Sequence, residues 1–268
     1  MKDNDSEKKI WTIVLVIATS FMLAACGEEY IGLSADYYIT DENVDAVCEV
    51  LSDAGLSNID VFRQWVMESH VNSDIESTDE DQNRITDADC RMTVMLLTGD
   101  SIKYDSVEED YKGNYLMYDI DAIENDDRYT ILKDKEKLFT TLFGEEPVRE
   151  EDAFDVIPMR WERHGIKMGS DKYSVITIHF TTLEGTETFV GHTCLLVDCR
   201  DNDNYDTDYI FVEKIAFGDP FYVTPIKDEN ELMEIFSARP DYSVLEGEPR
   251  PLVYKNGELL GELLQIDS

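Results

Sequence analysis

Three side chains of this sequence could together carry nucleophilic catalysis: Cys90, His192 and Glu213. Cys90 lies at the predicted first turn of an apolar helix, where unpaired N–H groups and partial positive charge favour a thiolate. His192 opens a later β-like run, and Glu213 lies in the run after it. A thiol, a base and a carboxylate that orients the base are suited to attack on an amide carbonyl. The sequence therefore nominates Cys90 as nucleophile, His192 as general base and Glu213 as the group that orients the imidazole.

The same residues also have non-catalytic interpretations. Cys90 can be an inert core thiol, because free cysteine is among the most buried residue types. His192 can be a histidine whose ring is satisfied at a strand end. Glu213 can face solvent, since alternation along its run does not say which face it takes. His179 is a competing base, although its place inside an apolar run favours a core histidine. Clustered ionisable groups indicate a functional site only as a matter of probability.

A zinc site is an alternative use of the thiols. It would take Cys90, His192, Cys194 and Cys199 as ligands, and His192 and Cys194 would share one face of a strand. However, the chain has no Cys-x-x-Cys or His-x-x-x-His pair of the kind that structural zinc sites carry. We therefore predict no zinc.

The acidic loop at 201–208 raises the question of calcium. Its aspartates are Asp201, Asp203, Asp206 and Asp208. An EF-hand loop beginning at Asn202 would place Glu213 at the twelfth position, but Thr207 stands where that loop needs glycine. In so acidic a chain the loop is better interpreted as a solvated turn, and we predict no cofactor.

The beginning of the chain predicts export and lipid attachment. Lys8 and Lys9 precede an apolar run over 10–22, which is shorter than the about 20 apolar residues of a membrane span. Such a run, ending in small residues, is typical of a secretory signal. The segment Leu23-Ala24-Ala25-Cys26 resembles a bacterial lipobox. The resemblance implies that residues 1–25 are removed, that Cys26 becomes a lipidated N-terminus, and that the protein is held at the outer face of the cell membrane.

The net charge limits the classes of partner that the protein can bind. The chain has 59 acidic and 23 basic residues, a formal charge of −36. Such a surface repels phosphates, which excludes nucleic-acid binding, and it repels anionic lipid headgroups as well. Membrane attachment must therefore come from the lipid on Cys26. The other four cysteines are interpreted mostly as free thiols, since a domain of this size does not need disulfides.

The elements that position the candidate residues follow from periodicity. A tether over 26–36 precedes a single domain over 37–268. In its first half, helical spacing predicts helices and in its second half apolar runs predict strands, so an α+β domain with a mostly antiparallel sheet is expected. Asn256-Gly257 between apolar residues predicts a hairpin turn. The expected helices cover 44–51, 58–70, 86–99, 133–143 and 229–237, and the expected strands cover 115–120, 174–180, 193–197, 209–217 and the two arms of the hairpin.

Two family resemblances bear on function. A cysteine opening a buried helix, a histidine opening a later strand and a polar residue on the next strand resemble the papain-like superfamily, which implies thiol-dependent amide hydrolysis or acyl transfer, with cell-wall peptides as the local substrate. The segments at 87–97, 191–196 and 211–217 resemble a Gram-positive lipoprotein family, group 4300 among domains of unknown function. That resemblance covers most of the domain and implies a shared fold and surface location without an activity. A non-catalytic binding or structural lipoprotein is the alternative.

Overall fold

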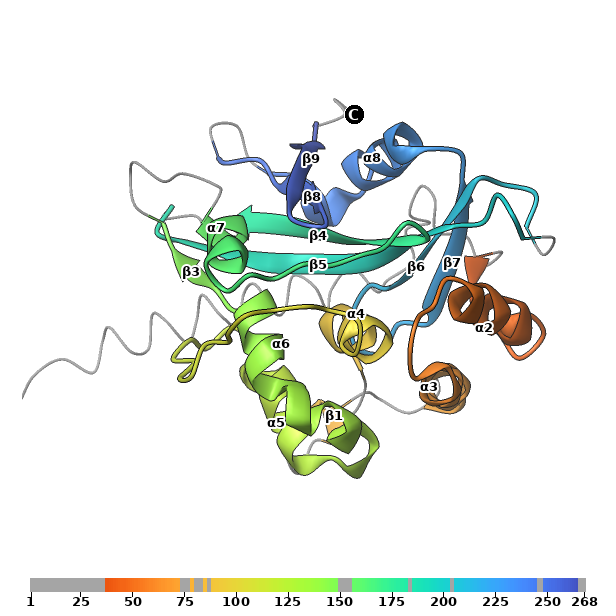
Figure 1. Cartoon of the computed structure of the whole chain (residues 1–268), viewed down its shortest axis with the longest axis horizontal. Helices are drawn as coiled ribbons and strands as arrows, with labels where there is room; N and C mark the ends of the chain where they lie inside the picture. Colours follow the sequence, from red (N-terminus) through yellow and green to blue (C-terminus); the bar gives the residue numbers. More distant parts are fainter. Residues whose placement is uncertain are drawn as a thin grey trace, which may run out of the picture.

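A mixed helix and sheet architecture is seen in the structure, a computed structural model that describes residues 37–72, 78–79, 84–85, 88–148, 156–182, 185–202, 205–244 and 248–264. In these residues a seven-stranded sheet lies between a large group of helices and a smaller layer that contains one C-terminal helix (Figure 1). Helices come mostly before strands along the chain. The predicted α+β class is confirmed.

The sheet is antiparallel at each of its pairings. Its order is β7-β6-β5-β4-β8-β9, and β3 pairs with β5 beside this path. The strands are β3 (Glu146–Pro147), β4 (Tyr173–Thr181), β5 (Glu187–Asp198), β6 (Tyr209–Lys214), β7 (Phe221–Ile226), β8 (Leu252–Lys255) and β9 (Glu258–Glu262). A separate pair is formed by β1 (Thr78–Asp79) and β2 (Arg84–Ile85). The strands expected at 193–197 and 209–217 lie in β5 and β6, which pair with each other in antiparallel orientation.

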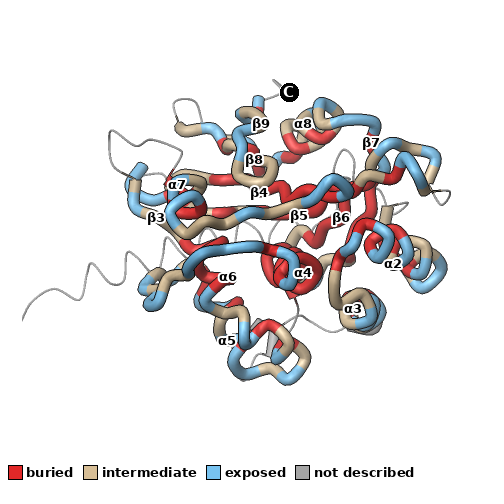
Figure 2. Tube along the Cα trace, in the orientation of Figure 1, coloured by how far each residue is buried: buried red, intermediate tan, exposed pale blue. Residues whose placement is uncertain are grey.

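The helices cover both faces of this sheet unequally. The larger group contains α2 (Val44–Asp53), α3 (Ile59–Asn72), α4 (Cys90–Thr98), α5 (Met117–Asn125), the 3-10 helix η2 (Asp127–Lys135), α6 (Glu136–Phe143) and α7 (Val156–Arg163). The other face carries α8 (Glu229–Ser237) and the short 3-10 helix η3 (Pro240–Tyr242). Figure 2 shows α4 as buried along its whole length, in the centre of the helical layer.

Two apolar clusters correspond to the two faces. Leu195 of β5 packs in the cluster that contains Met95 of α4. Cys194 packs in the other cluster, with Phe236 of α8. Because neighbouring residues of a strand point to opposite faces, the central strand divides the core into an α4 side and an α8 side.

The predicted elements are largely confirmed, with one clear error. The segment 115–120 was expected to be a strand, but α5 begins at Met117. Leu116, Ile120 and Ile123 are three and four residues apart, and Leu116 and Ile123 are fully buried, so the segment has a helical apolar face. Sequence reasoning also passed over α7 and β7.

The hairpin at the end of the domain has the expected turn. Asn256 and Gly257 have φ values of 52° and 89°, as a tight hairpin turn requires. The Asn256 side chain also accepts a hydrogen bond from the Val175 backbone N–H at 2.8 Å. The turn therefore joins β8 and β9 and fixes them to the start of β4.

The first described residues lie along the free side of β7. Tyr38 forms a bridge with Tyr222, and the Ile39 N–H donates to the Phe221 carbonyl at 2.8 Å. The signal segment, Cys26 and the tether lie outside the described residues. Among the helices that the structure describes, none has the length and apolar character needed to cross a membrane.

Candidate functional site

His192 and Glu213 meet on the α8 side of the sheet. The two residues lie on the adjacent strands β5 and β6, whose register pairs Leu195 with Val212. The His192 Nε2 atom is 2.8 Å from the Glu213 Oε2 atom. His192 is two residues from Cys194, so both side chains take the α8 face. The structure therefore brings together two of the three residues that the sequence nominated.

Arg239 is the partner that sequence reasoning missed. It follows α8, and its Nη2 and Nη1 atoms donate to the two carboxylate oxygens of Glu213 at 2.5 and 3.0 Å. Nη1 also donates to the Tyr242 hydroxyl at 3.2 Å. We call His192, Glu213, Arg239 and Tyr242 the Glu213 network. Its members are all buried, and the side chains of Glu213 and Arg239 are at most 2% exposed.

The protonation states of Glu213 and His192 depend on burial and on their contacts within this network. Burial raises the pKa of Glu213, but the charge of Arg239 and hydrogen bonds from His192 and Arg239 outweigh it and lower that pKa to about 2. Burial lowers the pKa of His192, and its bond to Glu213 only partly opposes this effect. The lowered pKa favours the neutral imidazole at pH 7. Since a carboxylate only accepts hydrogen bonds, His192 donates from Nε2. The salt bridge is therefore Glu213 with Arg239, and His192 adds a neutral hydrogen bond.

Cys90 lies at the first turn of α4, as expected, but it is buried and follows a carboxylate that caps the helix. The Asp89 side chain caps the helix by accepting from the Met92 N–H at 2.8 Å. The Cys90 sulfur accepts a hydrogen bond from the backbone of Thr193, the residue after His192. Burial, followed by the charge of Asp89, raises the pKa of Cys90 to about 12. The helix terminus was expected to favour the thiolate, and burial reverses this effect.

A second buried ion cluster surrounds the start of α4. Arg91 donates to both carboxylate oxygens of Asp119 at 3.1 and 3.2 Å and lies 2.6 Å from an Asp89 oxygen. Its Nη1 atom also donates to the Tyr115 hydroxyl at 3.1 Å. Burial raises the pKa of Asp119 well above its ordinary value, and the neighbouring Asp89 carboxylate raises it further. One arginine thus holds two carboxyl groups at the start of α4.

The competing base, His179, is a core residue. Its ring stacks on Tyr254 with centroids 4.4 Å apart and meets Trp161 edge to face. Its Nε2 atom is 2.9 Å from the Thr177 hydroxyl. Burial and the charge of Arg160 lower the pKa of His179 to about 3. This agrees with the core interpretation of His179 from sequence.

The lowered pKa of His179 predicts a loss of stability in acid. An unfolded histidine takes up a proton near pH 6.5, whereas folded His179 does so only near pH 3. Neutral His179 therefore makes its full contribution to the free energy of unfolding above about pH 6.5. That contribution falls by about 1.4 kcal/mol per pH unit as the pH drops toward 3. Between pH 5.5 and 4.5 the free energy of unfolding should fall in both proteins. We expect the fall in His179→Gln to be smaller than the fall in wild type by about 1.4 kcal/mol. Urea unfolding at both pH values measures it.

The matched control is His164→Gln, which removes a partly exposed histidine after α7 and keeps His179 in place. Equal pH dependence of His179→Gln and wild type would contradict the assignment of a neutral, buried His179.

The other candidate ligands do not converge in the described part of the chain. Cys48, Cys90, Cys194 and Cys199 are free thiols there. Cys48, on α2, is half-buried, and the other three are buried. Across the described residues, no three histidine, cysteine or acidic side chains form a group that could hold a metal ion. Asp203 of the acidic loop lies outside those residues.

The fold and its buried networks define an α+β domain whose helical layer and α8 layer enclose a central antiparallel sheet. Residues 62–260 match the family described as Domain of unknown function, DUF4300, and the chain belongs to this family. Neither the curated proteins nor the solved structures include a match to the chain.

Proposed function

We propose that this protein is a lipoprotein anchored by lipid at the outer face of the cell membrane. Its domain binds a ligand or serves a structural role and carries out no thiol chemistry. The observation that carries the proposal is the setting of Cys90, which is 3% exposed and has a pKa raised to about 12. A thiol nucleophile must be accessible and readily ionised. Cys90 has the opposite properties, which supports the non-catalytic role.

The Glu213 network also has a sufficient structural explanation. Glu213 on β6 is held by Arg239 after α8 and by His192 on β5, so the network joins two strands to the helix above them. A buried carboxylate needs such partners whether or not the site is catalytic. The location at the membrane is supported by the lipobox-like segment at 23–26. The charge of −36 disfavours direct binding to anionic lipid, so the attachment would depend on the lipid alone.

Thiol labelling of the folded full chain tests the non-catalytic role. At pH 6 we expect iodoacetamide to modify Cys48, which is half-buried, before Cys90, which is buried. Cys90 should be less than about one-tenth modified when Cys48 is complete, because alkylation requires thiolate and access. Peptide mass spectrometry after quenching measures both sites, and urea-unfolded protein is the control in which both should react. Faster labelling of Cys90 than Cys48 would overturn the proposal.

Thiol-dependent amide hydrolysis is the second candidate. The bond of 2.8 Å between His192 and Glu213 favours it, because a carboxylate that orients an imidazole is part of such machinery. This candidate requires release of ammonia or amine from cell-wall peptide fragments by the wild type and loss of that release in Cys90→Ala. The proposed role requires no turnover in either protein.

A further inference from the structure

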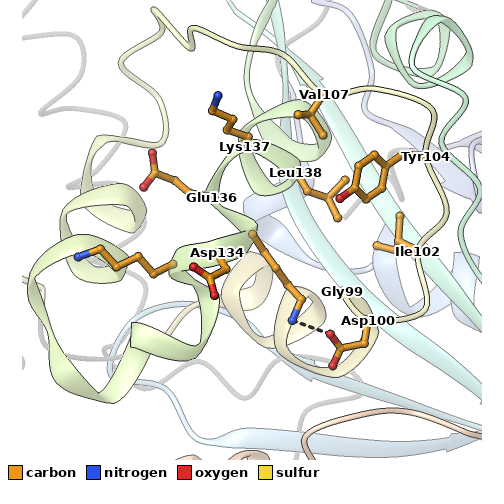
Figure 3. A pocket seen from close by; sticks show the side chains of 11 residues that line it. Gly99, Asp100, Ile102, Tyr104, Val107, Asp134, Glu136, Lys137 and Leu138 are labelled. Atoms are coloured by element: carbon orange, nitrogen blue, oxygen red, sulfur yellow. Dashed lines mark ion pairs between the residues drawn. The ribbon is translucent and has the colours of Figure 1, made fainter.

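A cavity of about 530 Å³ lies at the end of α4 opposite to Cys90. It is bounded by the C-terminal end of α4, the loop at 100–107 and the junction of η2 with α6 (Figure 3). Sites for small ligands usually have volumes of roughly 300–1,000 Å³, with apolar walls and a few converging polar groups. The cavity has the size of such a site and is separated from the Glu213 network by the length of α4.

One wall of the cavity is apolar. Ile102, Val107 and Leu138 line it together with the ring of Tyr104 (Figure 3). Tyr104 is 49% exposed, although the other apolar side chains of this wall are buried or half-buried. An aromatic ring offers a large contact area with few rotatable bonds, so it can cover an apolar group of a ligand at low entropic cost.

The cavity is also lined by three lysines and three acidic residues, and two of these, Lys135 and Asp100, form an ion pair. The Lys135 Nζ atom is 2.7 Å from Asp100 Oδ1, and the other Asp100 oxygen accepts from Asn58 at 3.2 Å. In Figure 3 a dashed line at Asp100 marks this ion pair. A Cβ atom at Gly99 would come within 2.9 Å of the Lys135 side chain, so glycine leaves room for the lysine stem. The ammonium and carboxylate are therefore held side by side before a ligand arrives.

This arrangement favours a ligand with both charges. A carboxylate placed beside Lys135 and an ammonium placed beside Asp100 would each meet its opposite charge. An anion or a cation alone would be attracted by one group and repelled by the other. The strongly acidic chain further disfavours polyanions. The apolar wall then requires an apolar side chain on the same molecule.

We propose that this cavity binds a free amino acid or a short peptide with free ends and an apolar side chain. The inference rests on the binding role proposed above and supplies its ligand class. Preorganised contacts of this kind reduce the cost of ordering on binding.

Calorimetric titration of the full chain with a panel of free dipeptides, each with one apolar side chain, tests the proposal. We expect saturable binding of at least one dipeptide. Its affinity should fall at least about tenfold in Lys135→Met and in Tyr104→Ala, because each change removes one class of contact. N-acetylated and C-amidated forms of the same dipeptide should also bind at least about tenfold more weakly, since each lacks one charge.

Matched controls alter similar residues elsewhere. Lys172→Met removes a lysine whose Nζ atom is also 2.8 Å from an aspartate, Asp201, and Tyr118→Ala removes another exposed tyrosine. Both controls should bind like wild type. Absence of binding across the panel, or equal affinity of Lys135→Met and Lys172→Met, would overturn the proposal. Turnover of the dipeptide that is lost in Cys90→Ala would instead refute the non-catalytic role and leave the binding result standing.

Discussion

Replacing Arg239 with methionine is expected to lower the free energy of unfolding by about 3–5 kcal/mol, because it leaves the Glu213 carboxylate buried without its charged partner. Glu213 is 1% exposed, and Arg239 supplies two hydrogen bonds to it. The pKa of Glu213, lowered to about 2 in the intact network, should rise in the variant. Urea unfolding of wild type and Arg239→Met at pH 7 measures the loss.

Two further proteins make this experiment specific. Arg200→Met removes an arginine that is paired with Asp198 but is itself 58% exposed, so solvent screens the pair and the change should cost about 1 kcal/mol or less. The double variant Arg239→Met with Glu213→Gln removes both charges and should recover part of the stability lost by Arg239→Met alone. A loss in Arg239→Met no larger than that in Arg200→Met would mean that the Glu213 network does not support the fold.

The change Cys26→Ser is expected to move the protein from the membrane fraction to the medium or to an unprocessed precursor. A serine cannot carry the thioether lipid, and the acidic domain has no electrostatic attraction to anionic lipid in its place. Detergent phase separation of cells that express wild type or Cys26→Ser, together with metabolic labelling by palmitate, measures the change.

Cys48→Ser is the control for a cysteine that the lipobox-like segment does not include. It should retain both membrane association and palmitate labelling. Equal labelling of wild type and Cys26→Ser would show that lipid is attached elsewhere or that labelling is unspecific.

Local signals predicted those elements whose caps and turns lie within a few residues. Asp228 caps α8 by accepting from the Asn230 and Glu231 N–H groups, and Asn256-Gly257 forms the turn that its sequence demands. Asp89 caps α4 in the same way. The strand expected at 115–120 was wrong because its β-like composition hid a helical apolar face.

The candidate site was less predictable, because its partners meet only in the folded chain. His192 and Glu213 were nominated from their order along the strands, and the structure places them in contact. Arg239 follows a helix end and has no periodic signal, yet it determines the charge of Glu213. The sequence also did not show how completely Cys90 is buried at the start of α4. Burial raises the pKa of this thiol, whereas a helix N-terminus would lower it.

The contact of Tyr38 with the free side of β7 determines which edge of the sheet would lie nearest to a lipid on Cys26. Eleven residues lie between Cys26 and Tyr38, and the twelve Cα-to-Cα steps of a fully extended chain would reach about 40 Å. With a lipid on Cys26, the β7 side of the sheet would therefore stay within about 40 Å of the bilayer surface. The opposite edge of the sheet is β9, which would be the part of the sheet furthest from that attachment. One bridge at the beginning of the domain would thus give an anchored protein a near edge and a far edge.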